Sequence, residues 1–340
     1  MTPTVSICMP TYNGAEYVGE AIASAQAQTF GEFEILVIDD GSSDATLDLV
    51  RGAARTDSRI RLLVNEANVG LVPNWNRCLL EARGTWIKFL FQDDVLEADC
   101  IGALLHATSQ ERRPFAACFR DFIFEQTVDT DVRNLYLDQQ SKVAGWYQSG
   151  GMTAQEFCGL LLTQPPRNLI GEPTVTLFRR DVVAAIGLFD PLLVHLCDAE
   201  YWSRIATRHG VAIVPRPLAK FRIHGSSATA ANSRTRKFRS ETLDPIVLMH
   251  RYLFADGYAA LRREMHARGA ANRWHEEFWN RCRYARAIAA DQLSRGLPTP
   301  AKDWAFLVDH LPAVEQPPLA STIRRVVRKL GQSVVPSTAK

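Results

Sequence analysis

Long apolar runs are absent from this 340-residue sequence, and none approaches the roughly 18 residues of a membrane-spanning helix. The first ten residues have neither a basic start nor an apolar stretch of signal-peptide length. The seven cysteines are scattered and include no C-x-x-C pair, which argues against a disulfide framework and a zinc knuckle. These absences predict a protein of the reducing cytoplasm.

A strong net charge is also lacking, since the formal total is only +2. Residues 1–230 nevertheless hold 20 Lys and Arg against 27 Asp and Glu, whereas residues 231–340 hold 19 against 10. An acidic first part suits a metal-using site, and a basic second part suits attraction to an acidic surface. Two solvated faces of one domain would give the same counts, so both interpretations stay open.

Short apolar segments alternate with amphipathic ones through the first hundred residues. We expect strands at 4–10, 33–40, 59–65 and 85–91, separated by helices at 13–28, 43–55 and 72–82. Asn13 and Glu16 resemble an N-cap and its capping-box partner at the start of the first helix. This alternation predicts a mostly parallel α/β sheet with helices on both faces. Ligands bind beyond the carboxyl ends of such strands, where the polar segments should meet in one crevice.

The pattern loosens after residue 100. Further strands are expected at 115–125, 173–180 and 218–224, helices at 153–162 and 198–208, and a variable loop at 127–151. From about residue 235 the sequence predicts an almost wholly helical region.

Two adjacent carboxylates, Asp93 and Asp94, follow an apolar segment in "WIKFLFQDDVLEAD". Desolvating an unpaired carboxylate is costly, so a cation is expected beside them. Mg²⁺ and Mn²⁺ prefer carboxylate oxygens and take their other ligands from phosphate and water. Capping of the next helix by these residues is the alternative.

Several ordered motifs together resemble glycosyltransferase family 2, whose members have the GT-A fold and invert the anomeric centre of the sugar. They are "VSICMPTYNGAEYVGEAIASAQAQTFGEFEILVIDDGSSDAT", "NEANVGLVPNWNRCLLEARGTWIKFLFQDD", "LCDAEYWSRIATRHG" and "FRIHGSS". The resemblance covers roughly residues 4–228 and leaves the remaining hundred or so residues outside it.

The resemblance implies a site for a nucleotide-diphosphate sugar and a divalent cation, Mn²⁺ or Mg²⁺. Asp93 is the expected metal ligand, with Asp94 second and His224 completing the shell. Phe91 stands where the family usually has the first Asp of Asp-x-Asp, which leaves the ribose contact open. The residues expected to bind the nucleotide sugar are Pro10, Thr11, Tyr12, Asn13, Asp39, Asp40, Asn68, Gly70, Gln92, Asp93 and Asp94.

The general base implied by the resemblance is Asp198, although Cys197 stands where the family usually has Glu. An inverting transfer needs a carboxylate that takes the proton of the attacking hydroxyl. An Asp at this place is equally a good helix N-cap, and that alternative is compatible with the sequence. Glu172, Pro173 and Trp202 are expected on the acceptor side.

These features predict a GT-A domain over residues 1–230, with a nucleotide-sugar half at 1–100 and an acceptor half at 101–230, followed by a helical region at 231–340. The expected reaction moves a sugar from a UDP- or dTDP-sugar to a hydroxyl of a glycan or lipid-linked acceptor, in cell-surface polysaccharide biosynthesis. A non-catalytic sugar-nucleotide-binding scaffold is the main alternative. A nucleotidyltransferase fits less well because "PTYNGAEY" is not a glycine-rich basic loop, and no G-x-G-x-x-G marks a dehydrogenase.

A basic amphipathic segment, residues 319–332, lies near the end of the sequence. It suits a helix docked on its own domain, and it also suits peripheral contact with the inner face of an anionic membrane. The basic residues are not part of a recognisable nucleic-acid-binding module, so nucleic acid is not an expected partner. The donor sugar, the base, the acceptor, the linkage and the oligomeric state are left open by the sequence.

Overall fold

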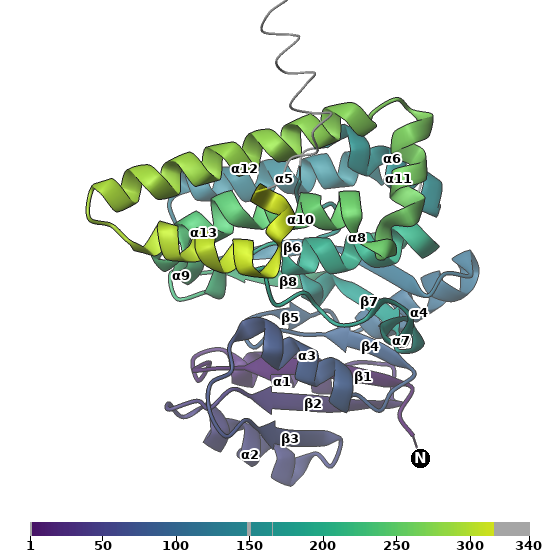
Figure 1. Cartoon of the computed structure of the whole chain (residues 1–340). Helices are drawn as coiled ribbons and strands as arrows, with labels where there is room; N and C mark the ends of the chain where they lie inside the picture. Colours follow the sequence, from purple (N-terminus) through teal and green to yellow (C-terminus); the bar gives the residue numbers. More distant parts are fainter. Residues whose placement is uncertain (1, 148–150, 165, 316–340) are drawn as a thin grey trace, which may run out of the picture.

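A computed structural model describes residues 2–147, 151–164 and 166–315 of the protein (Figure 1). An eight-stranded sheet has the order β3-β2-β1-β4-β7-β6-β8-β5. The strands are β1 Val5–Thr11, β2 Phe33–Asp39, β3 Ile60–Val64, β4 Trp86–Phe89, β5 Val95–Leu96, β6 Phe115–Phe124, β7 Thr176–Arg179 and β8 Ala212–Ile223. The predicted α/β class is therefore confirmed.

The first four strands form a parallel half-sheet. β1 lies between β2 and β4, and β2 also pairs with β3, in each case in parallel. The connecting helices are α1 Val18–Gln26, α2 Thr46–Thr56 and α3 Leu71–Glu81. Every residue of β1 and β2 is buried, as expected for strands covered on both faces. Thr11 is in register with Asp39, and Asp39 with Val64, so the loops after these strands leave from one edge.

The second half of the sheet is mixed. β7 runs antiparallel to β4 and β6, β8 runs parallel to β6, and the short β5 runs antiparallel to β8. β8 is the longest strand, with 12 residues, and its pairing with β5 joins Val95 to Lys220. The end of β8 is thereby brought next to the turn that carries Asp93 and Asp94.

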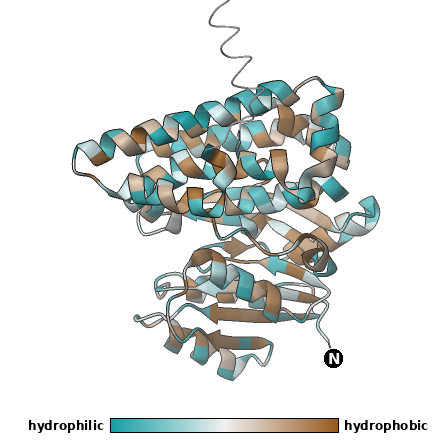
Figure 2. Ribbon diagram, in the orientation of Figure 1, coloured by the Kyte–Doolittle hydropathy of each residue, from teal (hydrophilic) through white to brown (hydrophobic). Residues whose placement is uncertain are grey.

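Helices of the second half include α4 Cys100–Glu111, α5 Thr130–Trp146, α6 Ala154–Thr163, α7 Asp181–Ile186 and α8 Cys197–His209. The later helices are α9 Ala228–Thr235, α10 Asp244–Phe254, α11 Ala259–Ala267, α12 Ala271–Ser294 and α13 Thr299–His310. Figure 1 shows α10 to α13 gathered above the β6–β8 side of the sheet, with β3 at the opposite end. In Figure 2 the strands in the lower part of the view are mostly apolar, whereas α12 mixes both kinds of residue.

The buried core does not break at residue 230. One apolar cluster runs from Val5 in β1 through Trp202 in α8 to Ile246 and Phe278 in the C-terminal helices. The helical region predicted after residue 235 is confirmed as far as residue 315, and it packs on the α/β part as a continuation of the same core. The basic segment at 319–332 lies outside the described residues.

Two local predictions are wrong. The expected variable loop at 127–151 contains the 17-residue helix α5, which Asp129 caps by accepting a hydrogen bond from the Asp131 N–H at 2.7 Å. Only Val143 of this helix is buried, so its sequence carries almost no amphipathic signal. Asn13 is not the N-cap of α1, because that helix begins at Val18 and Tyr17 precedes it.

Candidate functional site

The loops after β1 and β2 are joined through Asp39. Its fully buried carboxylate accepts hydrogen bonds from the Thr11 hydroxyl at 2.9 Å, the Ser42 N–H at 2.8 Å and the Ser42 hydroxyl at 2.6 Å. Asn13, whose φ is 46°, donates its N–H to Ser42 Oγ at 2.8 Å. The residues predicted at the base-binding end are therefore held in one fixed arrangement.

Asp40 ties the third loop to the same edge. Its carboxylate accepts hydrogen bonds from Asn65 Nδ2 at 2.6 Å, the Val69 N–H at 2.9 Å and the Gly70 N–H at 2.9 Å. Gly41 has a φ of 76°, and a Cβ there would lie 3.3 Å from the Asn68 backbone nitrogen. Asp40, Asn68 and Gly70 thus lie together, with Asn68 exposed and Asp40 buried.

Tyr12 is presented outward from this edge by Gln92. The Gln92 side chain accepts from the Tyr12 N–H at 2.9 Å and donates to the Tyr12 carbonyl at 3.1 Å. The Tyr12 side chain is 47% exposed, while Pro10 and Thr11 before it are buried. An exposed ring on a doubly fixed backbone is a suitable surface for stacking a planar ligand.

Asp93 lies in a turn four residues beyond β4, rather than on the strand itself. Its Oδ2 lies 3.0 Å from His224 Nε2, and the other imidazole nitrogen lies 2.8 Å from Ser226 Oγ. Arg222 donates to the Asp93 carbonyl at 3.0 Å and pairs with Glu20 at 2.5 Å. The end of β8 therefore fixes the orientation of both Asp93 and His224.

Asp94 faces the interior. It is fully buried, and its two oxygens accept hydrogen bonds from the Thr174 hydroxyl and, at 3.0 Å, from the Arg222 N–H. Burial, together with the charge of Asp93, raises the pKa of Asp94 well above its usual range. Asp94 thus connects the turn to β8 and to the short 3₁₀ helix Pro173–Val175.

Asp93 and His224 are the pair that fits a divalent cation. Within the described residues there is no group of three or more His, Cys, Asp and Glu placed to hold a metal. A carboxylate oxygen and an imidazole nitrogen 3.0 Å apart suit Mn²⁺ or Mg²⁺ when diphosphate and water supply the other ligands. The contact between Ser226 and the second ring nitrogen would orient the imidazole as a ligand.

Asp198 lies in the first turn of α8 and is half-buried. Its carboxylate accepts from Asn168 Nδ2 at 2.9 Å and from the Ala199 N–H at 2.6 Å. Burial raises the pKa of Asp198 from 3.8 to about 7, and the charge of Glu172 adds to the increase although these hydrogen bonds oppose it. A carboxylate of this pKa is well matched to accepting a proton near neutral pH.

The residues predicted on the acceptor side have different surroundings. Glu172 is partly exposed and pairs with Arg120 at 2.6 Å. Pro173 and Trp202 are buried, and the indole N–H donates to the Gly171 carbonyl at 3.1 Å. Trp202 thus bonds to the backbone immediately before Glu172.

These groups lie along one edge of the sheet and are linked by hydrogen bonds, with Asn168 joining Gly171 to Asp198. Asp39 is joined to Thr11, and the next residue, Tyr12, is joined to Gln92 beside Asp93. Thr174 holds Asp94, and the charge of Glu172, two residues before Thr174, raises the pKa of both Asp94 and Asp198.

Sequence reasoning missed the polar residues that support this edge. Asn168, Arg120 and Thr174 each hold a predicted site residue, but none belongs to a recognised motif. Asn168 lies in "QPPRN", for which the sequence predicted no specific role. No local signal pairs Thr174 with Asp94, because the two are 80 positions apart.

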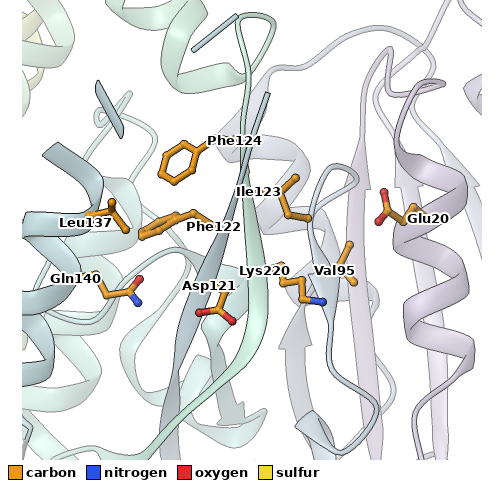
Figure 3. Close-up of a pocket in the computed structure, with 9 residues that line it drawn as sticks. All are labelled: Glu20, Val95, Asp121, Phe122, Ile123, Phe124, Leu137, Gln140 and Lys220. Atoms are coloured by element: carbon orange, nitrogen blue, oxygen red, sulfur yellow. The ribbon is translucent and has the colours of Figure 1, made fainter. Parts of the chain in front are cut away.

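A cavity of about 600 Å³ adjoins the site and is lined by α1, α5, β5, β6 and β8 (Figure 3). Phe122 lies on the side of Leu137 and α5, and Glu20 of α1 lies opposite. Glu20 also pairs with Arg222, which contacts the Asp93 carbonyl. The cavity is therefore adjacent to the Asp93 turn.

Among the helices that the structure describes, none is long and apolar enough to cross a membrane.

Comparison with known proteins gives one consistent result. The family model described as "Glycosyl transferase family 2" matches residues 6–186. The chain is 30% identical over 248 residues to the uncharacterized protein MT1568 of Mycobacterium tuberculosis, which is 69% of this chain and 72% of that protein. It is 32% identical over 97 residues to TuaG of Bacillus subtilis, a protein named for teichuronic acid biosynthesis, which is 28% of this chain and 38% of that protein.

Two solved structures share the fold at 16% sequence identity. TarS 1–349 of S. aureus in complex with UDP-GlcNAc has a TM-score of 0.56 and covers 92% of this chain and 90% of its own. The mannosyltransferase PcManGT of Pyrobaculum calidifontis in complex with GDP-Man and Mn²⁺ has a TM-score of 0.54 and covers 93% and 86%.

Proposed function

The chain belongs to glycosyltransferase family 2 and is a GT-A glycosyltransferase, and from this premise we propose that it moves a sugar from a UDP- or dTDP-sugar to an acceptor hydroxyl with inversion. The observation that carries the proposal is a set of hydrogen bonds along one edge. Thr11 bonds to Asp39, and Tyr12 bonds to Gln92 beside Asp93. Thr174 bonds to Asp94, and Asn168 bonds both to the nearby Gly171 carbonyl and to Asp198. Binding of a nucleotide, a diphosphate and an acceptor hydroxyl requires these three kinds of group along one crevice.

The nucleotide end of the donor is assigned to the loops after β1, β2 and β3. Tyr12 offers an exposed ring for the base, beside Asp39. Asp39, the residue assigned to the N3–H of a uracil or thymine, has one hydrogen bond on Oδ1, from the Ser42 N–H, and its carboxylate is buried, so this contact requires the Ser42 loop to move. Asn68 and Gly70 border the same crevice. UDP-GlcNAc bound to TarS supports a uridine nucleotide.

The diphosphate end is assigned to Asp93 and His224, which would hold Mn²⁺ or Mg²⁺, with Asp94 fixing the turn behind them. When bound, the cation supplies stabilisation of the negative charge that develops on the leaving diphosphate. PcManGT was solved with Mn²⁺, which supports this assignment.

Asp198 is assigned as the general base. Its carboxylate takes the proton of the acceptor hydroxyl while that oxygen forms the new bond to the anomeric carbon. The bond between this carbon and the diphosphate oxygen breaks, and the nucleoside diphosphate leaves with the electron pair. A single displacement of this kind inverts the anomeric centre, and a pKa of about 7 leaves much of Asp198 ionised at neutral pH.

The acceptor is proposed to be a glycan or a lipid-linked glycan of cell-surface polysaccharide biosynthesis. The name of TuaG supports this assignment. Glu172, held by Arg120, is the acceptor-side residue whose side chain is partly exposed. We propose that residues 1–100 form the nucleotide-sugar half and residues 101–230 the acceptor half of the catalytic domain. In this proposal, residues 231–340 form the helical region that follows it.

The test is a panel of UDP- and dTDP-sugars with Mn²⁺, scored first by thermal shift and then by release of nucleoside diphosphate. A ligand that binds only the folded protein raises its stability, so the correct donor should stand out. Release by the wild-type protein and its loss in Asp93→Ala support the proposal. Donor binding with no release, in the presence of any acceptor tried, would favour a non-catalytic scaffold instead.

A further inference from the structure

The loop that leads into α8 is held by residues from the C-terminal helical region. This loop, residues 187–196, ends two positions before Asp198. Four side chains of the helical region bond to it: Asn232, Arg239, Asp244 and Arg251. All four lie outside residues 6–186, where the family model matches.

Asp244 makes the largest set of these contacts. It is the first residue of α10 and is 1% exposed. Its carboxylate accepts hydrogen bonds from three successive backbone N–H groups: Val194 at 3.0 Å, His195 at 2.5 Å and Leu196 at 2.9 Å. A carboxylate that accepts several backbone N–H groups fixes the conformation of that backbone, since an alternative would leave buried donors unpaired.

The start of α8 needs such a partner. The N-cap residue Leu196 has an apolar side chain, so it cannot accept a hydrogen bond from the first turn. Asp244 supplies negative charge just before that turn, where the helix dipole favours it. The helix that carries Asp198 is thereby anchored by a residue 46 positions later in the chain.

The other three contacts hold the rest of the loop. Arg251 Nε pairs with Asp190 at 2.6 Å, and Arg239 donates to the Leu192 carbonyl at 3.1 Å. Asn232 donates to the Val194 carbonyl at 3.5 Å. The loop is thus fixed at 190, 192 and 194–196.

We propose that Asp244 is a positioning residue for the reaction, which holds the 194–196 backbone so that the Asp198 carboxylate reaches the acceptor hydroxyl. This rests on the proposed role of Asp198 as the base. It gives the C-terminal helical region a part in transfer, exerted through Asp198. Misplacement of a reacting group by about 1 Å costs on the order of a hundredfold in rate. The rate of the chemical step should therefore depend on Asp244, and donor binding should not.

The first experiment needs no substrate. Hydrogen exchange of the full-length protein is followed on peptides that cover residues 188–200, in wild type, Asp244→Ala and Tyr252→Phe. Tyr252 is a matched control, because it is buried on the same helix and its hydroxyl donates to Ser203 of α8 rather than to the loop. We expect the loop amides to exchange about tenfold or more faster in Asp244→Ala only. Unchanged exchange in a folded Asp244→Ala protein overturns the proposal.

The second experiment separates positioning from a general loss of structure. Nucleoside diphosphate release from the donor found in the panel is measured for Asp244→Ala, Asp244→Asn, Asp198→Asn and the Asp198→Asn/Asp244→Ala double variant. We expect kcat to fall about tenfold to a hundredfold in Asp244→Ala with less than about a twofold change in donor KM. Asp244→Asn, which keeps one acceptor oxygen, should recover part of kcat.

The double variant decides whether Asp244 acts through Asp198. If it does, removing Asp244 costs nothing more once Asp198 is gone, so the two effects are not additive. Additive losses measured on the residual rate of Asp198→Asn, or an Asp244→Ala enzyme with the wild-type kcat, overturn the positioning role. An active Asp198→Asn enzyme instead refutes the proposed base, and the exchange experiment then still decides whether Asp244 holds the loop.

Discussion

Asp93 and His224 are 131 positions apart in the chain, yet Asp93 Oδ2 lies 3.0 Å from His224 Nε2. The contact exists because β5 pairs with β8, which brings the end of β8 to the turn after β4. It joins the two halves of the sheet at the point where the donor diphosphate is proposed to bind.

This pair yields the first prediction. Asp93→Asn and His224→Ala should each weaken Mn²⁺ binding in the presence of UDP by about tenfold or more, because each removes one of two protein ligands. Isothermal titration of Mn²⁺ into the protein with UDP measures this without turnover. Ser226→Ala is the graded control, since it removes only the partner of His224 Nδ1 and should have a smaller effect. Equal Mn²⁺ affinity in wild type and His224→Ala would exclude His224 as a ligand.

The second prediction concerns the pH dependence of the reaction. Only the ionised form of Asp198 accepts a proton, and its pKa is about 7. The value of kcat/KM should therefore rise with pH up to about 7 and then level off. Asp198→Asn should lose about a thousandfold or more of the rate and show no such rise. Rates at several pH values with a saturating cation test both points, and a flat wild-type profile would contradict the assignment.

The parallel half of the fold could be predicted from the sequence, because each strand is a continuous run of apolar residues followed by turn residues. Asp39 and Asp40 could be placed at the rim for this reason, and the structure puts them there. The half-sheet around β7 was harder, since β7 has only four residues and runs antiparallel.

The long-range pairing of polar side chains could not be predicted from the sequence. The resemblance ranked Asp93 before Asp94 as metal ligand, but no sequence pattern predicted that Asp94 turns inward to Thr174 while Asp93 faces His224. The hydrogen bonds from the 194–196 backbone to Asp244 could not be predicted for the same reason. No local sequence pattern indicates a partner some fifty positions away.

A third prediction follows from the Tyr12–Gln92 contact. A Cβ at Gly14 would lie 2.2 Å from Gln92 Oε1, so Gly14→Ala must displace the side chain that holds the Tyr12 backbone. The fold should survive, because Gln92 is the flexible partner. Donor affinity should fall by about threefold to tenfold, through loss of the fixed Tyr12 ring.

The matched control is Gly19→Ala on the exposed side of α1, where an added Cβ meets nothing within 4 Å. It should leave donor affinity unchanged. Gln92→Ala should weaken donor binding as much as Gly14→Ala, and the double variant should be no worse than either. Wild-type affinity in Gly14→Ala would show that the Tyr12 arrangement does not matter for the donor.

The last prediction uses the raised pKa of Asp198 as a statement about stability. The folded protein keeps a proton on Asp198 up to about pH 7, whereas the unfolded chain loses it near 3.8. Between these values the folded state binds more protons, so the free energy of unfolding falls as pH rises.

The Asp198→Asn variant tests this, because Asn does not ionise and its free energy of unfolding does not fall with pH for this reason. The Tm of Asp198→Asn relative to wild type should therefore increase from about pH 4 to about pH 8. Asn keeps one acceptor oxygen, so one of the two hydrogen bonds from Asn168 and the Ala199 N–H is lost, which lowers the Tm at every pH and leaves the slope unchanged. A Tm difference that is constant across this range would mean that Asp198 titrates in the folded protein as it does in the unfolded chain, and that the site does not desolvate its carboxylate.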